Sequence, residues 1–403
     1  MKIKRDDSES MVIPIIQPHG VNPPATEGGS TTICRPLRDG TGVNAHRARC
    51  TAIALILGLS GMTVIAEPLV TPAPTAATDE ETGIVRLAGA WELSGPLVWV
   101  WPERISGRRG WVERYTAVLG ALPTDIDVAL AGTRPPAERA MAALGRPARY
   151  LHAPRVQDIW IADWAGWPGV DAEGRLVRVL ADHVTDRYSA RDRRRAEEDR
   201  AAGRALAEQL YGRTVTMPLR LNPLQLAHNG DNLALVSHRV IHQNEHLTLD
   251  ELRQALRRYM GFSEIIFFPP PPGEPDGRIA GVVRFVSPTH LLLAQPAPDS
   301  DMSSQAYLKS VRGLLRERLP AEMEILTVPR ATGAAADAHG SYLNLIAIGR
   351  TLWLPSFDQP TDEVVHRYLS DALPGYTVSL LPHEALVGAA ADGIILDRLH
   401  AHY

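Results

Sequence analysis

Thiol chemistry in this sequence is confined to two cysteines near its N-terminus, Cys34 and Cys50. A cysteine thiolate is a strong nucleophile at modest pKa and a common ligand of structural zinc. Two cysteines are too few for a dense disulfide framework or a thiolate zinc site, and none follows residue 50. The long remainder of the chain therefore carries no thiol nucleophile.

Histidines and carboxylates are the other candidates for chemistry. His228 has the acid–base capacity of an imidazole, and Asp163 is a carboxylate that could work with it. A single histidine beside a strand is equally compatible with a core or surface position. His242, His246 and Asp250 suggest a metal site, but they span a predicted helix start and lack a third ligand of clear spacing. We therefore predict no metal and no cofactor.

The overall composition is that of an ordinary globular chain. Hydrophobic residues make up 45% and charged residues 22% of the 403 positions, and the formal net charge is −4. This balance argues against a strongly electrostatic nucleic-acid binder, and no nucleic-acid partner is predicted. The charged run at 191–200 mixes both signs within a predicted helix, which is typical of a solvated helix face.

The first 66 residues do not resemble a folded core. Residues 1–45 mix charge with Pro, Gly, Ser and Thr without a hydrophobic period, which predicts disorder or a mis-assigned extension ahead of a true start near Val43. Residues 46–66 join a basic segment to a short apolar run that ends on small residues at Ala66. That pattern is typical of a signal peptide; the alternative is a buried or membrane-anchoring helix.

A Pro/Ala/Thr-rich stretch at 67–87 is predicted to be a linker, and the folded domain is placed at 88–403. Cleavage after Ala66 would leave a mature protein without cysteine, which suits an oxidising compartment. We therefore predict a secreted or periplasmic protein with no membrane contact after signal cleavage.

Short apolar strands alternate with amphipathic helices from residue 88 onward, which is the signature of an α/β fold. The best-marked helix covers 248–260, where Thr248 and Glu251 form a capping box and Gly261 ends the helix. Strand–helix–strand units of roughly 50–60 residues recur about five times. Radial repetition around a pseudo-axis and an open doubly wound sheet both fit this pattern. Predicted strands include Leu97–Trp101, Ile159–Ile161, Val282–Val286 and Tyr342–Ile348.

Several segments, in consistent order, resemble the agmatine deiminases and the bacterial-type peptidylarginine deiminases. GAWELSGPLVWVWPE at 89–103 is similar to the opening Trp-Pro strand of that family, and DIWIADWAGW at 158–167 to its Trp-x-Arg-Asp-x-Gly-Pro segment. HNGDNLALV at 228–236 resembles the Glu-Gly-Gly-Asn strand, and DGRIAGVVRFVSP at 276–288 the Asp-Gly-His-x-Asp segment. SYLNLIAIGRTLWLPSFD at 341–358 is close to the Ser-Tyr-x-Asn strand, and ADGIILDR at 391–398 stands where the family has Gly-Gly-Gly-x-His-Cys.

The resemblance covers about 88–400 and implies a pentein α/β-propeller, with five strand–helix modules around a pseudo-fivefold axis and a central pocket for guanidino compounds. It also implies that the catalytic set is degenerate. The nucleophilic cysteine falls on Leu396, the histidine on Arg278 and its neighbouring carboxylate on Ala280. The glutamate falls on Asn229, or on His228 if the register slips by one, and the arginine falls on Ala162. No catalytic set is therefore retained.

Asp163 and Asn344 match polar positions of the family, and either could be kept for structure alone. We take Asp163, Asn344, Arg278, His228 and Trp160 as the candidate pocket residues. An internal ion pair between Arg278 and Asp163 could occupy the pocket as a built-in ligand analogue.

The leading hypothesis is a secreted pseudoenzyme that binds or regulates. Its partner would be a small molecule, either a guanidino compound or an anion. The alternative is a hydrolase or deiminase with a non-family constellation around Asp163 and His228, or with Asp397 as nucleophile. An oligomer is possible if tryptophans such as Trp164 and Trp167 lie in an interface rather than in the core.

Overall fold

The computed structural model describes residues 83–101, 111–132, 138–139, 142–144, 149–153, 155–183, 189–297, 299–331, 341–382 and 400–402. All of them belong to the second of two units into which the chain divides, Ala73–Tyr403. The predicted N-terminal extension and signal peptide lie outside the described residues, as does Leu396. No helix within those described ranges has both the length and the apolar character needed to cross a membrane.

The strands of the described residues form five sheets, and each sheet contains the same three-strand module. The first strand of the module is antiparallel to the second, and a helix then leads to a third strand parallel to the second. Two sheets have four strands, in the pairing orders β1 (Ile84–Leu87), β5 (Trp167–Asp171), β6 (Leu176–Asp182), β7 (Thr214–Arg220) and β17 (His400–His402), β2 (Leu97–Val100), β3 (Val128–Gly132), β4 (Arg149–His152). Two of the three-stranded sheets pair in the orders β10 (Glu264–Phe268), β9 (Leu233–Ser237), β8 (Leu226–His228) and β11 (Val283–Phe285), β12 (His290–Ala294), β13 (Glu324–Val328). The third three-stranded sheet has the order β14 (Ile346–Ile348), β15 (Thr351–Ser356), β16 (Thr377–Pro382).

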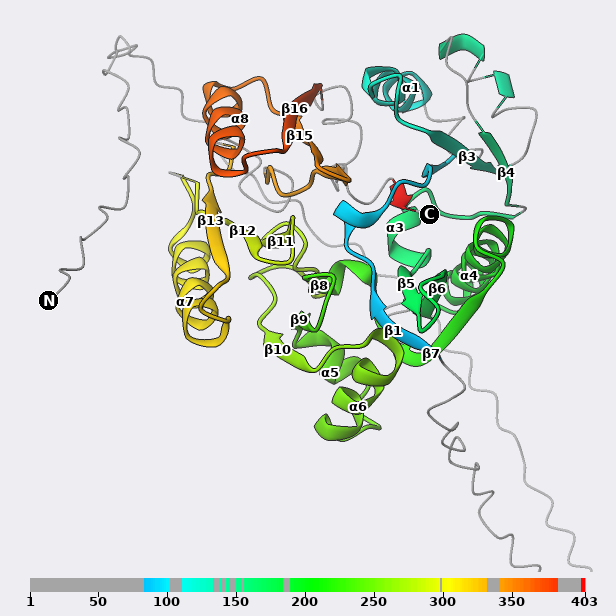
Figure 1. Ribbon diagram of the computed structural model, residues 1–403, viewed down its shortest axis with the longest axis horizontal. Coiled ribbons are helices and arrows are strands. Elements are labelled where there is room, and N and C mark those ends of the chain that lie inside the picture. Colours follow the sequence, from blue (N-terminus) through cyan, green and yellow to red (C-terminus); the bar gives the residue numbers. More distant parts are fainter. Residues whose placement is uncertain are drawn as a thin grey trace, which may run out of the picture. The chain divides into compact units, whose positions relative to one another are not determined.

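Helices connect the second and third strands of the modules, and Figure 1 shows them on the outer side of the sheets, which succeed one another around a common centre. This is the radial arrangement of the α/β fold, and it decides between the two architectures that the sequence pattern left open. The helical elements are η1 (Ala90–Glu92), α1 (Trp111–Ala121), α3 (Ile161–Trp164), α4 (Ala190–Leu210), η2 (Pro223–Gln225), α5 (Arg239–Gln243), α6 (Leu249–Met260), α7 (Met302–Arg318) and α8 (Pro360–Ala372).

Central strands are apolar on both faces, as expected for strands covered by helices on one side and by other modules on the other. Every residue of β2, β3 and β9 is buried. The predicted capping box of α6 is confirmed: the Thr248 hydroxyl accepts a hydrogen bond from the Glu251 amide at 3.2 Å, and the Glu251 carboxylate accepts one from the Thr248 amide at 2.7 Å.

The last described strand pairs with the second one. Strand β17, near the C-terminus, pairs antiparallel with β2, and this pairing completes the fifth module. Strand β1 adds to β5 at the edge of another sheet. A radial arrangement of small sheets leaves only short strand edges.

Three predicted elements differ from the structure. The predicted strand Ile159–Ile161 is not a strand and leads into helix α3, which begins at Ile161. Of the predicted strand Tyr342–Ile348, only Ile346–Ile348 is paired as a strand. The last residues of the predicted linker, Ile84–Leu87, form strand β1, because their pairing with β5 supplies backbone hydrogen bonds that composition does not reveal. Trp164 and Trp167 are buried in the core rather than exposed.

Candidate functional site

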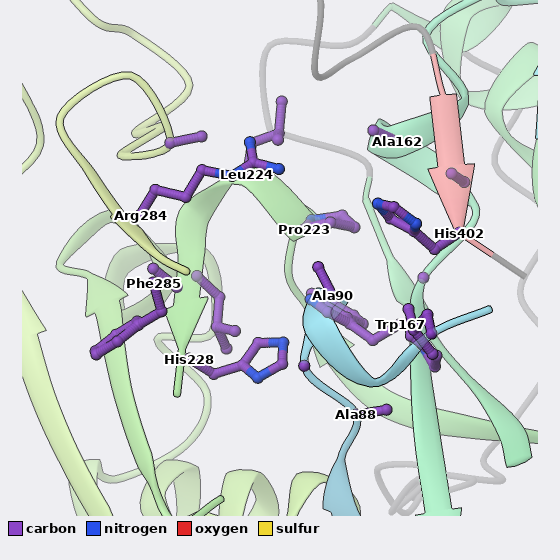
Figure 2. Close-up of a pocket in the computed structure, with 18 of the residues that line it drawn as sticks. Ala88, Ala90, Ala162, Trp167, Pro223, Leu224, His228, Arg284, Phe285 and His402 are labelled. Carbon is purple, nitrogen blue, oxygen red and sulfur yellow. The ribbon is translucent and has the colours of Figure 1, made fainter. Parts of the chain in front are cut away.

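A cavity of about 190 Å³ lies where four of the five described sheets come together. Its walls come from the segment around η1, from α3 and β5–β6, from η2 and β8, from β11, and from β17. Figure 2 shows Arg284 and His402 on opposite sides of one end of this cavity, with Pro223 between them and His228 toward the other end. The radial arrangement thus brings segments far apart in sequence to one site.

An ion pair fixes the η1 wall. The Arg86 guanidinium contacts the Glu92 carboxylate at 2.6 and 2.8 Å, and it also donates to the Gly230 carbonyl at 2.8 Å. Glu92 accepts the Gly89 amide at 3.0 Å, which holds the turn of η1. These contacts attach η1 to the β8–β9 turn, directly after His228.

A buried guanidinium fixes the opposite wall. Arg178 in β6 is 1% exposed, its Nε donates to the Ala165 carbonyl at 2.6 Å, and its Nη1 donates to the His402 carbonyl. One side chain therefore joins β6, the end of α3 and the C-terminal strand β17. Gly166 follows at φ +72°, and a Cβ there would lie 2.1 Å from the Val179 carbonyl oxygen, so only glycine fits this turn.

Two histidines of the cavity wall are held neutral at pH 7. Loss of water around the ring lowers the pKa of His228 to about 4, and its Nδ1 accepts a hydrogen bond from the Gly230 amide at 3.2 Å. Burial is also the main reason why the pKa of His402 lies well below its usual value, and the nearby His400, Arg284 and Arg178 lower it further. Positive or potentially positive groups therefore converge around His402.

The two alanines at degenerate family positions, Ala162 and Ala280, both line the cavity. The resemblance implies an arginine and a carboxylate at these two positions, and that assignment stays a prediction. Leu396, the predicted nucleophile position, lies outside the described residues, and so does Asp397.

Of the candidate pocket residues, His228 lines the cavity, whereas Asp163, Asn344, Arg278 and Trp160 are absent from its described lining. Asp163 is buried within α3, and its negative charge acts on His183. Asn344 is buried, and Trp160 packs at the N-terminal end of α3 against a core cluster. A direct role of these residues in ligand binding stays a prediction.

Arg278 is engaged within its own loop. Its guanidinium lies 2.9 Å from the Asp276 carboxylate and 3.7 Å from that of Glu274. The ion pairs recorded for the described residues do not join Arg278 to Asp163. The expected built-in ligand analogue is therefore replaced by a local pairing of Arg278 with two nearby carboxylates, while its buried Nε has no hydrogen-bond partner among the described residues.

Asn229 has a structural role in the β8–β9 turn. Its side-chain oxygen accepts the amides of Asp231 and Leu233 at 3.1 and 3.0 Å, which shapes the hairpin. The tetrapeptide Asn222-Pro223-Leu224-Gln225, which precedes β8, brings Pro223 and Leu224 to the cavity.

Sequence reasoning missed most of the polar residues that line the cavity. Arg178 and Arg284 lie on strands where a charged side chain interrupts an apolar run, as in Val283-Arg284-Phe285. His400 and His402 flank Ala401 in a strand of three residues, which is too short for a periodicity signal. An arginine inside a predicted buried strand is the signal that could have pointed to this site.

Comparison with known proteins supports the same family. A model of the Porphyromonas-type peptidyl-arginine deiminases matches residues 86–391. An agmatine deiminase of Ectopseudomonas mendocina is 27% identical over 172 residues, which cover 36% of this chain and 47% of that protein. One from Pseudomonas aeruginosa is 25% identical over 172 residues, 36% of this chain and 47% of its own length. The chain thus matches about half the length of these relatives.

Solved structures share the fold. The agmatine deiminase of C. jejuni superimposes with a TM-score of 0.66 at 16% identity, covering 78% of this chain and 95% of that one. The agmatine deiminase of Enterococcus faecalis gives 0.65 at 13% identity, covering 81% and 98%. At these identities the likeness shows a pentein fold. Because the family model matches well over half of the sequence, this chain belongs to the family of Porphyromonas-type peptidyl-arginine deiminases.

Proposed function

We propose that this chain is a secreted family member that has lost guanidine hydrolysis and acts as a ligand-binding pseudoenzyme. The observation that carries the proposal is the position of its cysteines: both precede residue 51, whereas the family match begins at residue 86. The part of the chain that matches the deiminases therefore contains no thiol.

Deimination requires a nucleophile, a proton donor and carboxylates, and this chain lacks several of these groups at the family positions. A nucleophile must add to the guanidinium carbon, ammonia must leave with a proton from an acid, and water must then hydrolyse the adduct to the ureido product. Carboxylates must hold the planar cation during these steps. Here Ala162 and Ala280 stand at two of the polar family positions, and both leave only methyl groups at the cavity wall. Loss of several such groups together leaves only binding effects.

An alternative hydrolase built on Asp163 and His228 is less well supported. His228 lines the cavity, but Asp163 is absent from its described lining and belongs to the buried face of α3. With a pKa near 4, His228 is also far from the operating pH at which a general base is most effective.

Assay of ammonia release with agmatine, free arginine and an arginyl peptide tests the loss of activity. We expect no turnover above the buffer rate from the purified chain. Sustained release of ammonia, abolished by Asp397→Ala, would show instead that the family reaction continues with an oxygen nucleophile.

Secretion rests on the basic and apolar pattern of residues 46–66. N-terminal sequencing of the protein recovered outside the cytoplasm is expected to start at Glu67. A product that retains residues 46–66 would contradict the proposed cleavage.

A further inference from the structure

The imidazole of His228 lines the cavity with one ring nitrogen bonded and the other open. Its Nδ1 accepts the Gly230 amide at 3.2 Å, and in a neutral imidazole the second nitrogen then carries the proton. Within the described ranges, no atom accepts a hydrogen bond from Nε2 of His228. The chain therefore presents one N–H donor to a molecule that enters this space.

Several contacts hold the His228 ring in this orientation. Phe262, itself fully buried, packs beside it with ring centroids 5.9 Å apart. The Gly230 carbonyl accepts from Arg86 at 2.8 Å, so both backbone polar groups of Gly230 are bonded and the turn after His228 is fixed. Figure 2 shows the imidazole extending from β8 toward Ala90, which lines the cavity from the η1 segment. A donor held in this way loses little conformational freedom when a ligand binds.

The ring keeps this donor neutral over a wide pH range. Loss of water lowers the pKa of His228 to about 4, against the opposing effect of the Glu92 charge, and the Arg86 charge lowers it further. At pH 7 the imidazole is therefore uncharged. A neutral donor offsets the desolvation of a carbonyl oxygen better than that of a carboxylate, so a neutral acceptor is the better match.

Aromatic and aliphatic groups surround this donor. The Trp91 indole lies against the backbone, since Cβ atoms added at Gly89 and Gly230 would approach it to 2.4 and 2.8 Å. Leu226 and Phe285 supply further apolar lining. The cavity volume of about 190 Å³ is a little larger than the engineered cavity of about 150 Å³ that accepts benzene. The space therefore suits a molecule little larger than one aromatic ring.

We propose that this cavity binds a small aromatic molecule with a neutral carbonyl group, whose oxygen accepts a hydrogen bond from Nε2 of His228 while the ring lies against Trp91 and Phe285. An N–H without a partner in a closed space is unfavourable, so a ligand that supplies an acceptor is favoured over one of the same shape that does not. The inference rests on the proposed function, because it requires a site that binds a ligand without transforming it.

Acetophenone and α-methylstyrene test this donor, because the two molecules share a shape and a CH₂ group replaces the carbonyl oxygen in the second. In calorimetric titration of the full chain, His228→Phe should weaken acetophenone binding about fivefold and change α-methylstyrene binding by less than about twofold. The difference between the two probes isolates the hydrogen bond from the change in packing.

Two further variants serve as controls. His228→Gln keeps an N–H donor on a shorter side chain and should restore part of the acetophenone affinity. His242→Phe makes the same change at an exposed histidine and should alter neither titration. Equal effects of His228→Phe on both probes, or no binding of acetophenone to wild type, would overturn the inference.

The tautomer of His228 gives a readout on wild type that does not depend on the folding of a variant. Nitrogen NMR of protein with isotope-labelled histidine should show a neutral His228 ring protonated at Nε2 at pH 7, and a proton on Nδ1 would refute the donor. Ammonia release that His228→Phe abolishes would instead refute the proposed function, so the two failures are distinguishable.

Discussion

Two alanine side chains, those of Ala162 and Ala280, shape the chemical character of the cavity wall. Ala162 and Ala280 line it at positions where the resembling family has polar side chains, while Arg284 and His402 remain on the wall. The resemblance implies an arginine at the first position and a carboxylate at the second, so methyl groups replace two polar groups of the implied pocket. Ligand preference at this site is therefore a property of a few side chains rather than of the fold.

The absence of a thiol after residue 50 and the alanines at 162 and 280 could be predicted from the sequence, because they follow from composition and from motif spacing. The four basic residues Arg178, Arg284, His400 and His402 were not, since an arginine inside an apolar strand is only a weak local signal and the two histidines give none. Their convergence depends on contacts between strands that are more than a hundred residues apart in the chain.

At the scale of elements, each module uses its helix ends and turns to fix strand positions. The C-terminus of α6 is an example: Gly261 has φ +81°, and its α-carbon packs against β1, so that a Cβ would lie 2.0 Å from the Val85 carbonyl oxygen. A glycine that ends one helix therefore also allows the first described strand to reach its sheet.

Gly261→Ala should destabilise the protein strongly. The left-handed backbone alone costs roughly 1 kcal/mol for alanine, and the clash with the backbone of β1 adds about 1–3 kcal/mol. Gly273→Ala is the matched control, since Gly273 has φ +78° but nothing within 4 Å of its added Cβ. Urea denaturation of both variants separates the two costs; equal losses of stability would show that β1 yields without penalty.

Elements with long apolar periods were predictable, and short ones were not. Thr248 and Glu251 predicted the start of helix α6 and Gly261 its end, and the structure confirms all three signals. The run Ile159–Ile161 satisfies strand composition, yet the chain turns there into α3, which places Ala162 at the cavity. A run of three residues shows too little periodicity to distinguish a strand from a helical turn, and tertiary contacts then determine which one forms.

On the scale of the whole molecule, closure depends on one buried side chain. Arg178 ties β6 and the end of α3 to β17, and β17 in turn completes the sheet that begins with β2. Loss of this guanidinium would leave two buried carbonyl groups without their donor, which is costly in a region closed to water.

Arg178→Met should lower the free energy of unfolding by about 3 kcal/mol and speed amide exchange in His400–His402. Arg367→Met provides the control, because the side chains of Arg367 and its partner Glu363 are 71% and 65% exposed, and such an ion pair is worth at most about 1 kcal/mol. Chemical denaturation and hydrogen exchange give the two readouts. Unchanged exchange in β17 would mean that strand pairing with β2 alone holds the closure.

A second buried charge links the stability of the molecule to pH. Asp199 on α4 is 2% exposed and accepts the amides of Gln157 and Asp158 at 2.6 and 3.2 Å, so it attaches α4 to the segment before α3. Burial, together with the charges of Asp158 and Glu198, raises the pKa of Asp199 to about 7. The folded state therefore holds a proton that the unfolded state has released above pH 4.

Because the folded state binds more protons between pH 4 and 7, stability falls as pH rises through that window and levels off above it. The full difference is on the order of 4 kcal/mol. Asp199→Asn keeps an oxygen for the two amides and removes the titrating group, so its melting temperature should depend less on pH between 5 and 8. Asp301→Asn is the control: its pKa is lowered by the Ser304 amide and side chain, so this carboxylate stays ionised over the same range in both states. If Asp199→Asn and wild type lose stability in parallel from pH 5 to 8, then the carboxyl of Asp199 is ionised in the folded protein throughout, and another group must set the alkaline limit of stability.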